Sequence, residues 1–169
     1  MSDPCLELLT KELAKQKKKT SLTYITESTG DWAPIAKYSK HAICNRWDIR
    51  EKFKSKYAQL HFNDFILPKD LLVKRYILRV SKEKAQVHHL INISMNKLPK
   101  NGELLICGMR KEGIKTYIEK IEENWKCHVK TVTTSSGSRL AIVRKMDDSK
   151  GSLDDKNYQS LRAINLKGG

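Results

Sequence analysis

Cysteine and histidine, the residues that most often hold metals or act as nucleophiles, are present in this chain but are poorly spaced for either task. The four cysteines are Cys5, Cys44, Cys107 and Cys127, and no two of them form a CxxC pair. The five histidines contain no HxxxH pair, and a zinc site usually needs ligands that are close together in sequence. The spacing predicts no metal site. It favours buried, reduced cysteines, notably Cys44 and Cys107, which stand inside apolar runs.

Nucleophilic and cofactor chemistry are also unsupported by the motifs. No GxSxG pattern is present. An α/β domain that binds a nucleotide or S-adenosylmethionine normally has a glycine-rich turn after its first strand and an acidic residue after the next one. Here the first loop is Glu27-Ser28-Thr29-Gly30-Asp31, with one glycine, and the second strand runs into Asn45-Arg46. We therefore predict no catalytic and no cofactor-binding residue in this chain.

Two glycines, Gly108 and Gly113, bracket a loop between an apolar strand and a helix. Its five-residue spacing is neither GxGxxG nor a P-loop. Two interpretations stay open for this loop. It is a plain connection, or its helix start, together with Arg110 and Lys111, contacts a phosphate group.

The formal net charge of the chain is +14, and the excess is concentrated in its middle. Residues 41–100 hold 13 basic and 5 acidic side chains. Such density attracts polyanions, although a lysine-rich composition throughout the chain is the alternative explanation. The RNA-binding candidates are Arg46, Arg50, Lys52, Lys54, Lys56, Lys82, Lys84, Arg110 and Lys111.

The three tryptophans do not predict a base-stacking surface. Trp32, Trp47 and Trp125 stand at the edges of expected helices, where core or rim packing is the better expectation. No RNP-type aromatic pattern accompanies them.

No apolar stretch approaches the roughly 20 residues that a membrane span needs. The first residues, Met1-Ser2-Asp3-Pro4, do not resemble a signal peptide. We expect a cytoplasmic protein without a membrane partner.

The elements that position these residues alternate between strands and helices. Asp3 and Pro4 are suited to begin a helix with a stripe of Leu6, Leu9 and Leu13. Strands are expected at 22–26, 42–44, 57–62, within 71–80 and at 104–107, helices at 47–53, from Ser81 to 98 and at 114–125, and a hairpin at 127–145. This order predicts an α/β fold with a mostly parallel sheet covered on both faces and a C-terminal antiparallel hairpin. Residues 1–146 form the expected domain, and 147–169 an expected polar linker.

The run from Leu98 to Gly108, LPKNGELLICG, then Gly113-Ile114, resembles the N-terminal domain of the bacterial ribosomal RNA small subunit methyltransferase C family. The lysine-rich start of the helix at 81–86 and the end of the hairpin at 139–145 are similar to that domain as well. The resemblance covers residues 5–146 and is most specific over 78–146.

This resemblance implies a degenerate Rossmann-like methyltransferase fold that binds no methyl donor and helps to hold the RNA. In the family, S-adenosylmethionine and an Asn-Pro-Pro-aromatic motif belong to a C-terminal catalytic half. This chain has no Asn-Pro dipeptide, since its prolines follow Asp3, Ala33, Leu67 and Leu98. The catalytic half would begin near 153–166, so no catalytic residue is carried over.

The expected function is that of an RNA-binding and supporting domain of a 16S rRNA guanine-N2 methyltransferase. Its expected partners are small-subunit ribosomal RNA and a catalytic domain in cis or in trans. Two alternatives stay open: a scaffold that stabilises a catalytic partner, and a small active methyltransferase with an atypical cofactor loop at Glu27–Asp31.

Overall fold

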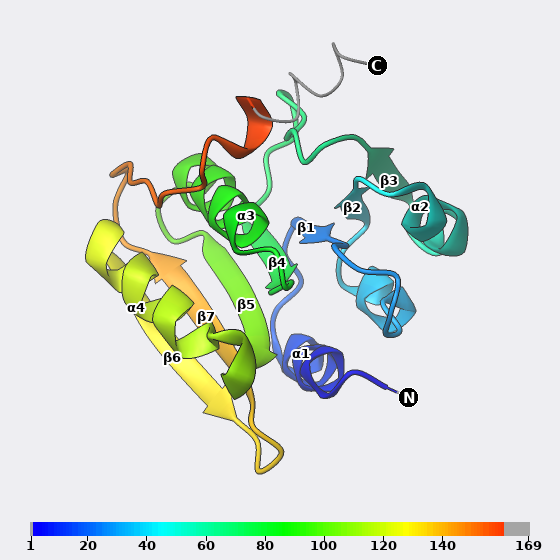
Figure 1. The fold of residues 1–169 in the computed structure, drawn as a ribbon, viewed down its shortest axis with the longest axis horizontal. Helices are drawn as coiled ribbons and strands as arrows, with labels where there is room; N and C mark the ends of the chain where they lie inside the picture. The colour runs from blue at the N-terminus through cyan, green and yellow to red at the C-terminus, as the bar shows by residue number, and fades with distance from the viewer. Residues whose placement is uncertain (1, 161–169) are drawn as a thin grey trace.

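The computed structural model describes residues 2–160 of the chain. Within them, seven strands form one sheet in the order β3-β2-β1-β4-β5-β7-β6 (Figure 1). The strands are β1 (Ser21–Tyr24), β2 (His41–Cys44), β3 (Gln59–Phe62), β4 (Arg75–Arg79), β5 (Glu103–Met109), β6 (Cys127–Thr133) and β7 (Ser138–Lys145). The helices are α1 (Pro4–Lys15), α2 (Trp47–Phe53), α3 (Lys84–Lys97) and α4 (Ile114–Asn124), with two 3-10 helices, η1 (Ala33–Lys37) and η2 (Arg110–Glu112).

The first five strands are parallel, and the last two form an antiparallel hairpin. β3, β2, β1, β4 and β5 pair in parallel in that order, whereas β7 runs antiparallel to both β5 and β6. The predicted mostly parallel sheet with a C-terminal hairpin is confirmed. From β1 the chain first builds outward to β3 and then returns to place β4 on the other side of β1. The two halves of the sheet therefore diverge between β1 and β4, a switch point where folds of this class bind ligands.

Both faces of the sheet are covered, because neighbouring residues of a strand point to opposite faces. On one face, Leu78 and Ile106 belong to a core cluster that includes α3 and α4. On the other face, Ile77 and Leu105 belong to a cluster that includes α1, α2 and η1 (Figure 1). The continuous apolar run in β5 thus reflects burial on both sides, as expected of a central parallel strand.

Helix α1 begins as its sequence predicts. The Asp3 carboxylate accepts a hydrogen bond from the Cys5 backbone N–H at 2.8 Å, and Pro4 occupies the first turn. Leu9 and Leu13 are buried against the sheet. Helix α3 begins later than predicted, at Lys84. Ser81 does not cap it, because its hydroxyl donates instead to Gln86 Oε1 at 2.9 Å.

Residues 147–169 are the predicted polar linker. Its described part, residues 147–160, lies along α3, and residues 161–169 lie outside the described residues. Two asparagines one helical turn apart on α3 hold the backbone of this segment. Asn92 donates to the Leu153 carbonyl at 2.9 Å and accepts from the Leu153 N–H at 2.7 Å. Asn96 likewise donates to the Gly151 carbonyl at 2.8 Å and accepts from the Gly151 N–H at 2.9 Å. The side chains of Leu153 and Tyr158 are buried.

Replacing Asn92 and Asn96 together by alanine is expected to release this segment. Four hydrogen bonds to the segment are lost, together with the one that Trp125 Nε1 donates to Asn96 Oδ1 at 3.0 Å, at about 1 kcal/mol each. Trypsin should therefore cleave after Lys150 and Lys156 at least about tenfold faster. Limited proteolysis followed by mass spectrometry measures the rate. Asn124→Ala is the matched control, because Asn124 donates only to the Lys120 carbonyl within its own exposed helix end. Equal cleavage of the double variant and this control would contradict the assignment.

Candidate functional site

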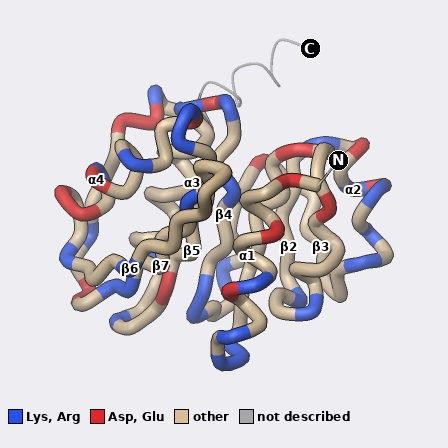
Figure 2. The backbone as a smooth tube through the Cα atoms, turned by 90° about the horizontal axis from the view of Figure 1, so that it is seen from below, with Lys and Arg blue, Asp and Glu red and all other residues tan. Residues whose placement is uncertain are grey.

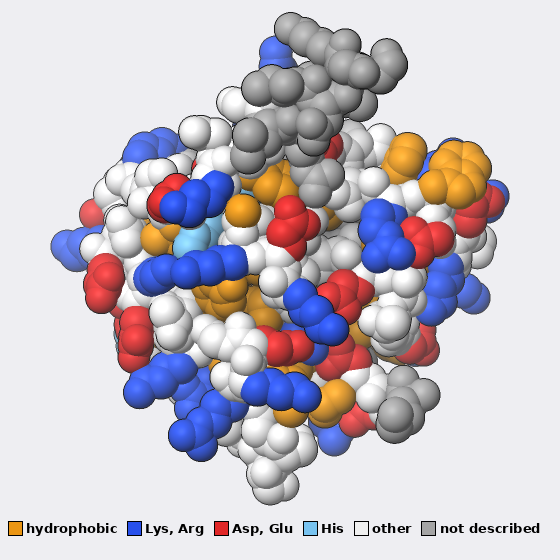
Figure 3. Space-filling view, viewed as in Figure 1, with side chains coloured by type: hydrophobic (Ala, Val, Ile, Leu, Met, Phe, Trp, Pro, Cys, Tyr) orange, Lys and Arg blue, Asp and Glu red, His pale blue; other side chains and the backbone are white. Residues whose placement is uncertain are grey.

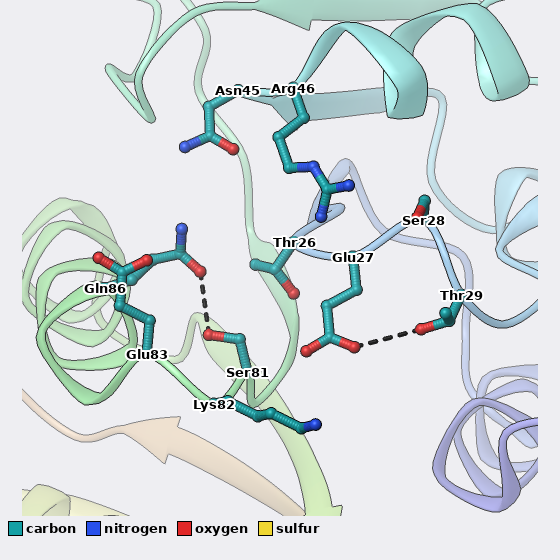
Figure 4. A pocket seen from close by; sticks show the side chains of 10 residues that line it. All are labelled: Thr26, Glu27, Ser28, Thr29, Asn45, Arg46, Ser81, Lys82, Glu83 and Gln86. Atoms are coloured by element: carbon teal, nitrogen blue, oxygen red, sulfur yellow. Dashed lines mark hydrogen bonds between the residues drawn. The ribbon is translucent and has the colours of Figure 1, made fainter.

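A hollow of about 500 Å³ lies beside the switch point, where β1, β2 and β4 end (Figure 4). We call it the switch-point hollow. Three loops supply its walls, and its lining residues are Thr26, Glu27, Ser28, Thr29, Asn45, Arg46, Ser81, Lys82, Glu83 and Gln86. The sequence placed the first two loops here, because each follows a predicted strand. It did not indicate Ser81, Gln86 or Glu83, which were expected inside or at the cap of a helix.

The loop after β1 uses its single glycine for packing. Gly30 has φ +85°, and a Cβ at this position would lie 2.8 Å from Leu6 Cδ1 of α1. The close approach that this glycine permits is therefore to a helix and not to a ligand. Beside it, the Thr29 hydroxyl donates to Glu27 Oε2 at 3.2 Å, so the loop presents a carboxylate to the hollow (Figure 4).

The end of β2 presents a cation. Arg46 points from this strand toward the loop that follows β1 (Figure 4). Its guanidinium binds the Asp48 carboxylate through two contacts, Nε–Oδ1 at 3.0 Å and Nη2–Oδ2 at 2.6 Å. An α/β domain that binds a nucleotide or S-adenosylmethionine normally has an acidic residue here, which accepts from the ribose hydroxyls.

The residues of the switch-point hollow thus do not fit S-adenosylmethionine. The loop carries side chains where a glycine-rich turn would approach the cofactor, and a cation stands where its ribose would need an acceptor. No methyl-transfer step follows from this geometry.

A chain of polar side chains begins at the lining of the hollow and links distant parts of the sequence. Ser81 donates to Gln86, and Gln86 Nε2 donates to the Tyr158 hydroxyl at 3.3 Å. Tyr158 donates in turn to Asp64 Oδ1 at 3.5 Å, which also accepts from Asn45 Nδ2 at 3.4 Å. Tyr158 therefore connects the C-terminal segment to Gln86, a lining residue of the hollow, and no motif in the sequence indicated this contact.

All nine predicted RNA-binding residues lie in connections that follow a parallel strand. Lys54 and Lys56 come just after α2, where the chain returns to the amino end of β3, and Gln59, which begins β3, donates there to the Lys40 carbonyl at 3.0 Å. The remaining predicted residues follow the carboxyl ends of the strands, and we call these the basic edge. Of all nine, Arg46 and Lys82 line the switch-point hollow, whereas the other seven lie outside it. These seven are Arg50, Lys52, Lys54 and Lys56 in and just after α2, Lys84 at the start of α3, and Arg110 and Lys111 in η2.

Much of the charge on α2 is locally paired, which charge density along the sequence could not show. Arg50 binds Glu51 at 3.0 Å, and Lys54 binds the same carboxylate at 2.5 Å. Figure 2 shows acidic residues interleaved with the basic ones along α2. Exposed pairs of this kind contribute little to stability and exchange readily for other anions. Among the described residues, Lys82 and Lys84 make no ion pair, and both are exposed.

The cysteines are unsuited to nucleophilic chemistry. Cys44 and Cys107 are buried in strands, as predicted, and all four thiols are free. Burial raises the pKa of Cys44 to about 11 and that of Cys5 to about 12. Almost no thiolate is present at neutral pH with such values. In the part of the chain that the structure describes, no three His, Cys, Asp or Glu side chains form a group that could hold a metal ion.

Comparison with known proteins connects this fold to methyltransferases. A family model described as "Methyltransferase small domain N-terminal" matches residues 7–134. No curated protein sequence matches the chain significantly. Among the described residues, no helix is long and apolar enough to cross a membrane.

Several solved structures share the fold at low sequence identity. The 16S rRNA N2 G1207 methyltransferase of T. thermophilus, in complex with AdoMet and guanosine, matches with a TM-score of 0.69 and 14% identity. The match covers 90% of this chain and 41% of that one, so this chain spans less than half of that protein's length. The N-methyltransferase NodS of Bradyrhizobium japonicum WM9 matches with a TM-score of 0.60 and 12% identity, over 87% of this chain and 100% of that one. The precorrin-6y C5,15-methyltransferase of Geobacter metallireducens GS-15 matches with a TM-score of 0.57 and 12% identity, over 86% of this chain and 94% of that one.

Proposed function

The chain belongs to the methyltransferase small domain N-terminal family, and from that premise we propose that it binds RNA and does not itself transfer a methyl group. Its role is to hold and support the substrate of a 16S rRNA guanine-N2 methyltransferase. A catalytic domain, in cis or in trans, supplies S-adenosylmethionine and the chemistry. The site of action is the cytoplasm.

One observation carries the proposal: the switch-point hollow keeps the place of a cofactor site but has the wrong groups for the cofactor. Arg46 occupies the position of the ribose acceptor, and Gly30 packs on α1. The same edge of the sheet carries Lys82 and Lys84, which are exposed and without ion pairs among the described residues. A cationic edge of this kind suits the phosphate backbone of RNA.

The test is the salt dependence of binding to a fragment of small-subunit ribosomal RNA, measured by fluorescence anisotropy. The variant K82Q/K84Q removes two cations from the basic edge. It should weaken binding at low salt and reduce the slope of log K against log salt by about 1 per lysine. A calorimetric titration with S-adenosylmethionine should release no heat.

The matched control removes two exposed lysines from another part of the surface. Lys37 ends η1 and Lys40 immediately precedes β2, so both lie toward the amino ends of the strands. K37Q/K40Q lowers the net charge by the same amount, so a general loss of attraction affects both variants equally. If the two variants have equal slopes of log K against log salt, or if the unmodified protein binds no RNA, the basic edge is not the RNA-binding surface.

A further inference from the structure

Trp47 is exposed on the surface, contrary to the core or rim packing expected from the sequence. Its exposed fraction is 61%, whereas Trp32 and Trp125 are buried as expected. Phe62, the last residue of β3, is 48% exposed and lies beside it, with ring centroids 6.0 Å apart and planes at 76°. Figure 3 shows hydrophobic side chains at the surface in the region of α2 and β3. Two large aromatic side chains thus form one solvent-facing patch.

The short helix α2 explains why Trp47 faces outward. Ile49 and Phe53, one turn apart, are the buried residues of this helix. Trp47 and Arg50 lie on the remaining surface of the helix, and β3 is an edge strand that pairs only with β2. The local fold therefore presents the aromatic pair to solvent.

Arg50 completes the patch. Its guanidinium carbon lies 4.8 Å from the Trp47 ring centroid and 6.0 Å from that of Phe62. The guanidinium also forms an exposed ion pair with Glu51 at 3.0 Å. Cation–π contact of this geometry restrains both side chains before any ligand arrives. The three side chains form a preorganised surface of aromatic rings and one planar cation.

The surroundings of the patch indicate the chemistry of its partner. Residues 46–56 contain five basic and two acidic side chains, so the patch stands in a cationic region. Exposed rings among cations suit a ligand that combines a flat apolar group with a phosphate. An unpaired nucleotide is such a ligand, because its base stacks on aromatic or guanidinium planes while its phosphate meets lysine.

We propose that Trp47, Phe62 and Arg50 form a stacking site for an unpaired RNA base. This inference rests on the proposed function and adds to it a preference for single-stranded over double-stranded RNA. In a duplex the bases are already stacked and cannot reach the rings. The basic edge holds the backbone, and the patch selects unpaired nucleotides beside it.

The test uses intrinsic fluorescence, because the other two tryptophans are buried. A ten-nucleotide single-stranded oligoribonucleotide should quench the Trp47 emission, and a duplex of equal length should not. Trp47→Ala should weaken single-strand binding by about 5- to 100-fold, the range for one stacked base, and leave duplex binding and the salt slope unchanged. Trp47→Phe should retain most of the affinity.

Leu72→Ala is the matched control, since Leu72 is an 80% exposed apolar side chain outside the patch. Circular dichroism checks that each variant folds. If RNA binds but Trp47→Ala and Leu72→Ala behave alike, the stacking site is overturned and the proposed function stands. If the unmodified protein binds no RNA, both are overturned. If Trp47→Ala abolishes a concentration-dependent dimer in sedimentation and leaves RNA affinity intact, the patch is a protein interface and the stacking site is overturned.

Discussion

Replacement of Glu103 by alanine is expected to destabilise the domain by about 3–5 kcal/mol, because it leaves a buried guanidinium without its counter-ion. Glu103 begins β5 and is almost fully buried. Its carboxylate binds Lys19 at 2.8 Å, Arg75 at 3.5 Å and Arg144 at 3.5 Å. Arg75 is buried to the same extent, and its Nε has no hydrogen-bond partner among the described residues.

Urea unfolding followed by circular dichroism measures this loss. A domain of this kind is stable by about 5–15 kcal/mol, so the loss is a large fraction of the total and should lower the urea midpoint clearly. Glu119→Ala is the control, because Glu119 forms an exposed pair with Lys115 at 3.8 Å. Its removal should change stability by less than about 0.5 kcal/mol. A Glu103→Ala midpoint equal to that of the control would show that the buried cluster does not hold the sheet.

The same carboxylate makes the fold sensitive to acid. Burial opposes its ionisation, but the hydrogen bond and charge of Lys19, and then the charge of Arg75, hold the pKa of Glu103 below its usual value of 4.5. As the pH falls below 4.5, the unfolded chain takes up a proton before the folded one does. The contribution of Glu103 is therefore complete above this pH and disappears as the pH falls through the lower value of the folded state. Glu103→Gln should lack this part of the acid dependence.

Arg79→Met is expected to have an effect of similar size at the other end of the sheet. Arg79 ends β4, and its side chain is 12% exposed. It binds Asp3 through Nε at 2.9 Å and Glu112 through both terminal nitrogens, at 2.6 and 3.0 Å. The variant leaves two partly buried carboxylates without a cation, which should reduce the free energy of unfolding by about 3–5 kcal/mol.

A double-mutant cycle tests this assignment. Combining Arg79→Met with Glu112→Gln removes one orphaned charge, so the double variant should be more stable than the sum of the two single effects implies. Arg79→Lys should recover only part of the loss, because an ammonium cannot bind Glu112 through two parallel hydrogen bonds. Arg110→Met, on the exposed neighbouring turn, is the control. Additive effects in the cycle would contradict a direct Arg79–Glu112 interaction.

The parts of the fold that the sequence predicts best are those with a regular apolar pattern. The run from Leu104 to Cys107 indicates a strand buried on both faces, and the stripe of Ile114, Ile118 and Ile121 indicates α4. Both are confirmed. In these elements the same residues that show the pattern also form the core. Helix α2 is too short to show such a pattern, so the sequence could not tell that Ile49 faces inward and Trp47 outward.

The contacts that sequence pattern could not predict are polar and join distant segments. Asn92 and Asn96 bind the backbone of the C-terminal segment, and Ser81 turns toward Gln86 instead of capping α3. Such hydrogen bonds follow no period along the chain. In the switch-point hollow, the sequence placed the loop at Glu27 and the end of β2, because motifs define those positions. The hydrogen bond from Gln86 to Tyr158 depends on tertiary structure alone.

The position of α1 has a consequence for the order in which the chain folds during synthesis. This helix is made first, yet Leu9 and Leu13 belong to the same cluster as Leu140 and Ile142 of β7, the last strand. The central strand β1 likewise pairs with β4, which is made some fifty residues later. Local pairing alone cannot bury the leucines of α1, and long-range contacts of this kind form slowly. During synthesis the apolar stripe of α1 is therefore fully covered only after residues up to about 145 have been made.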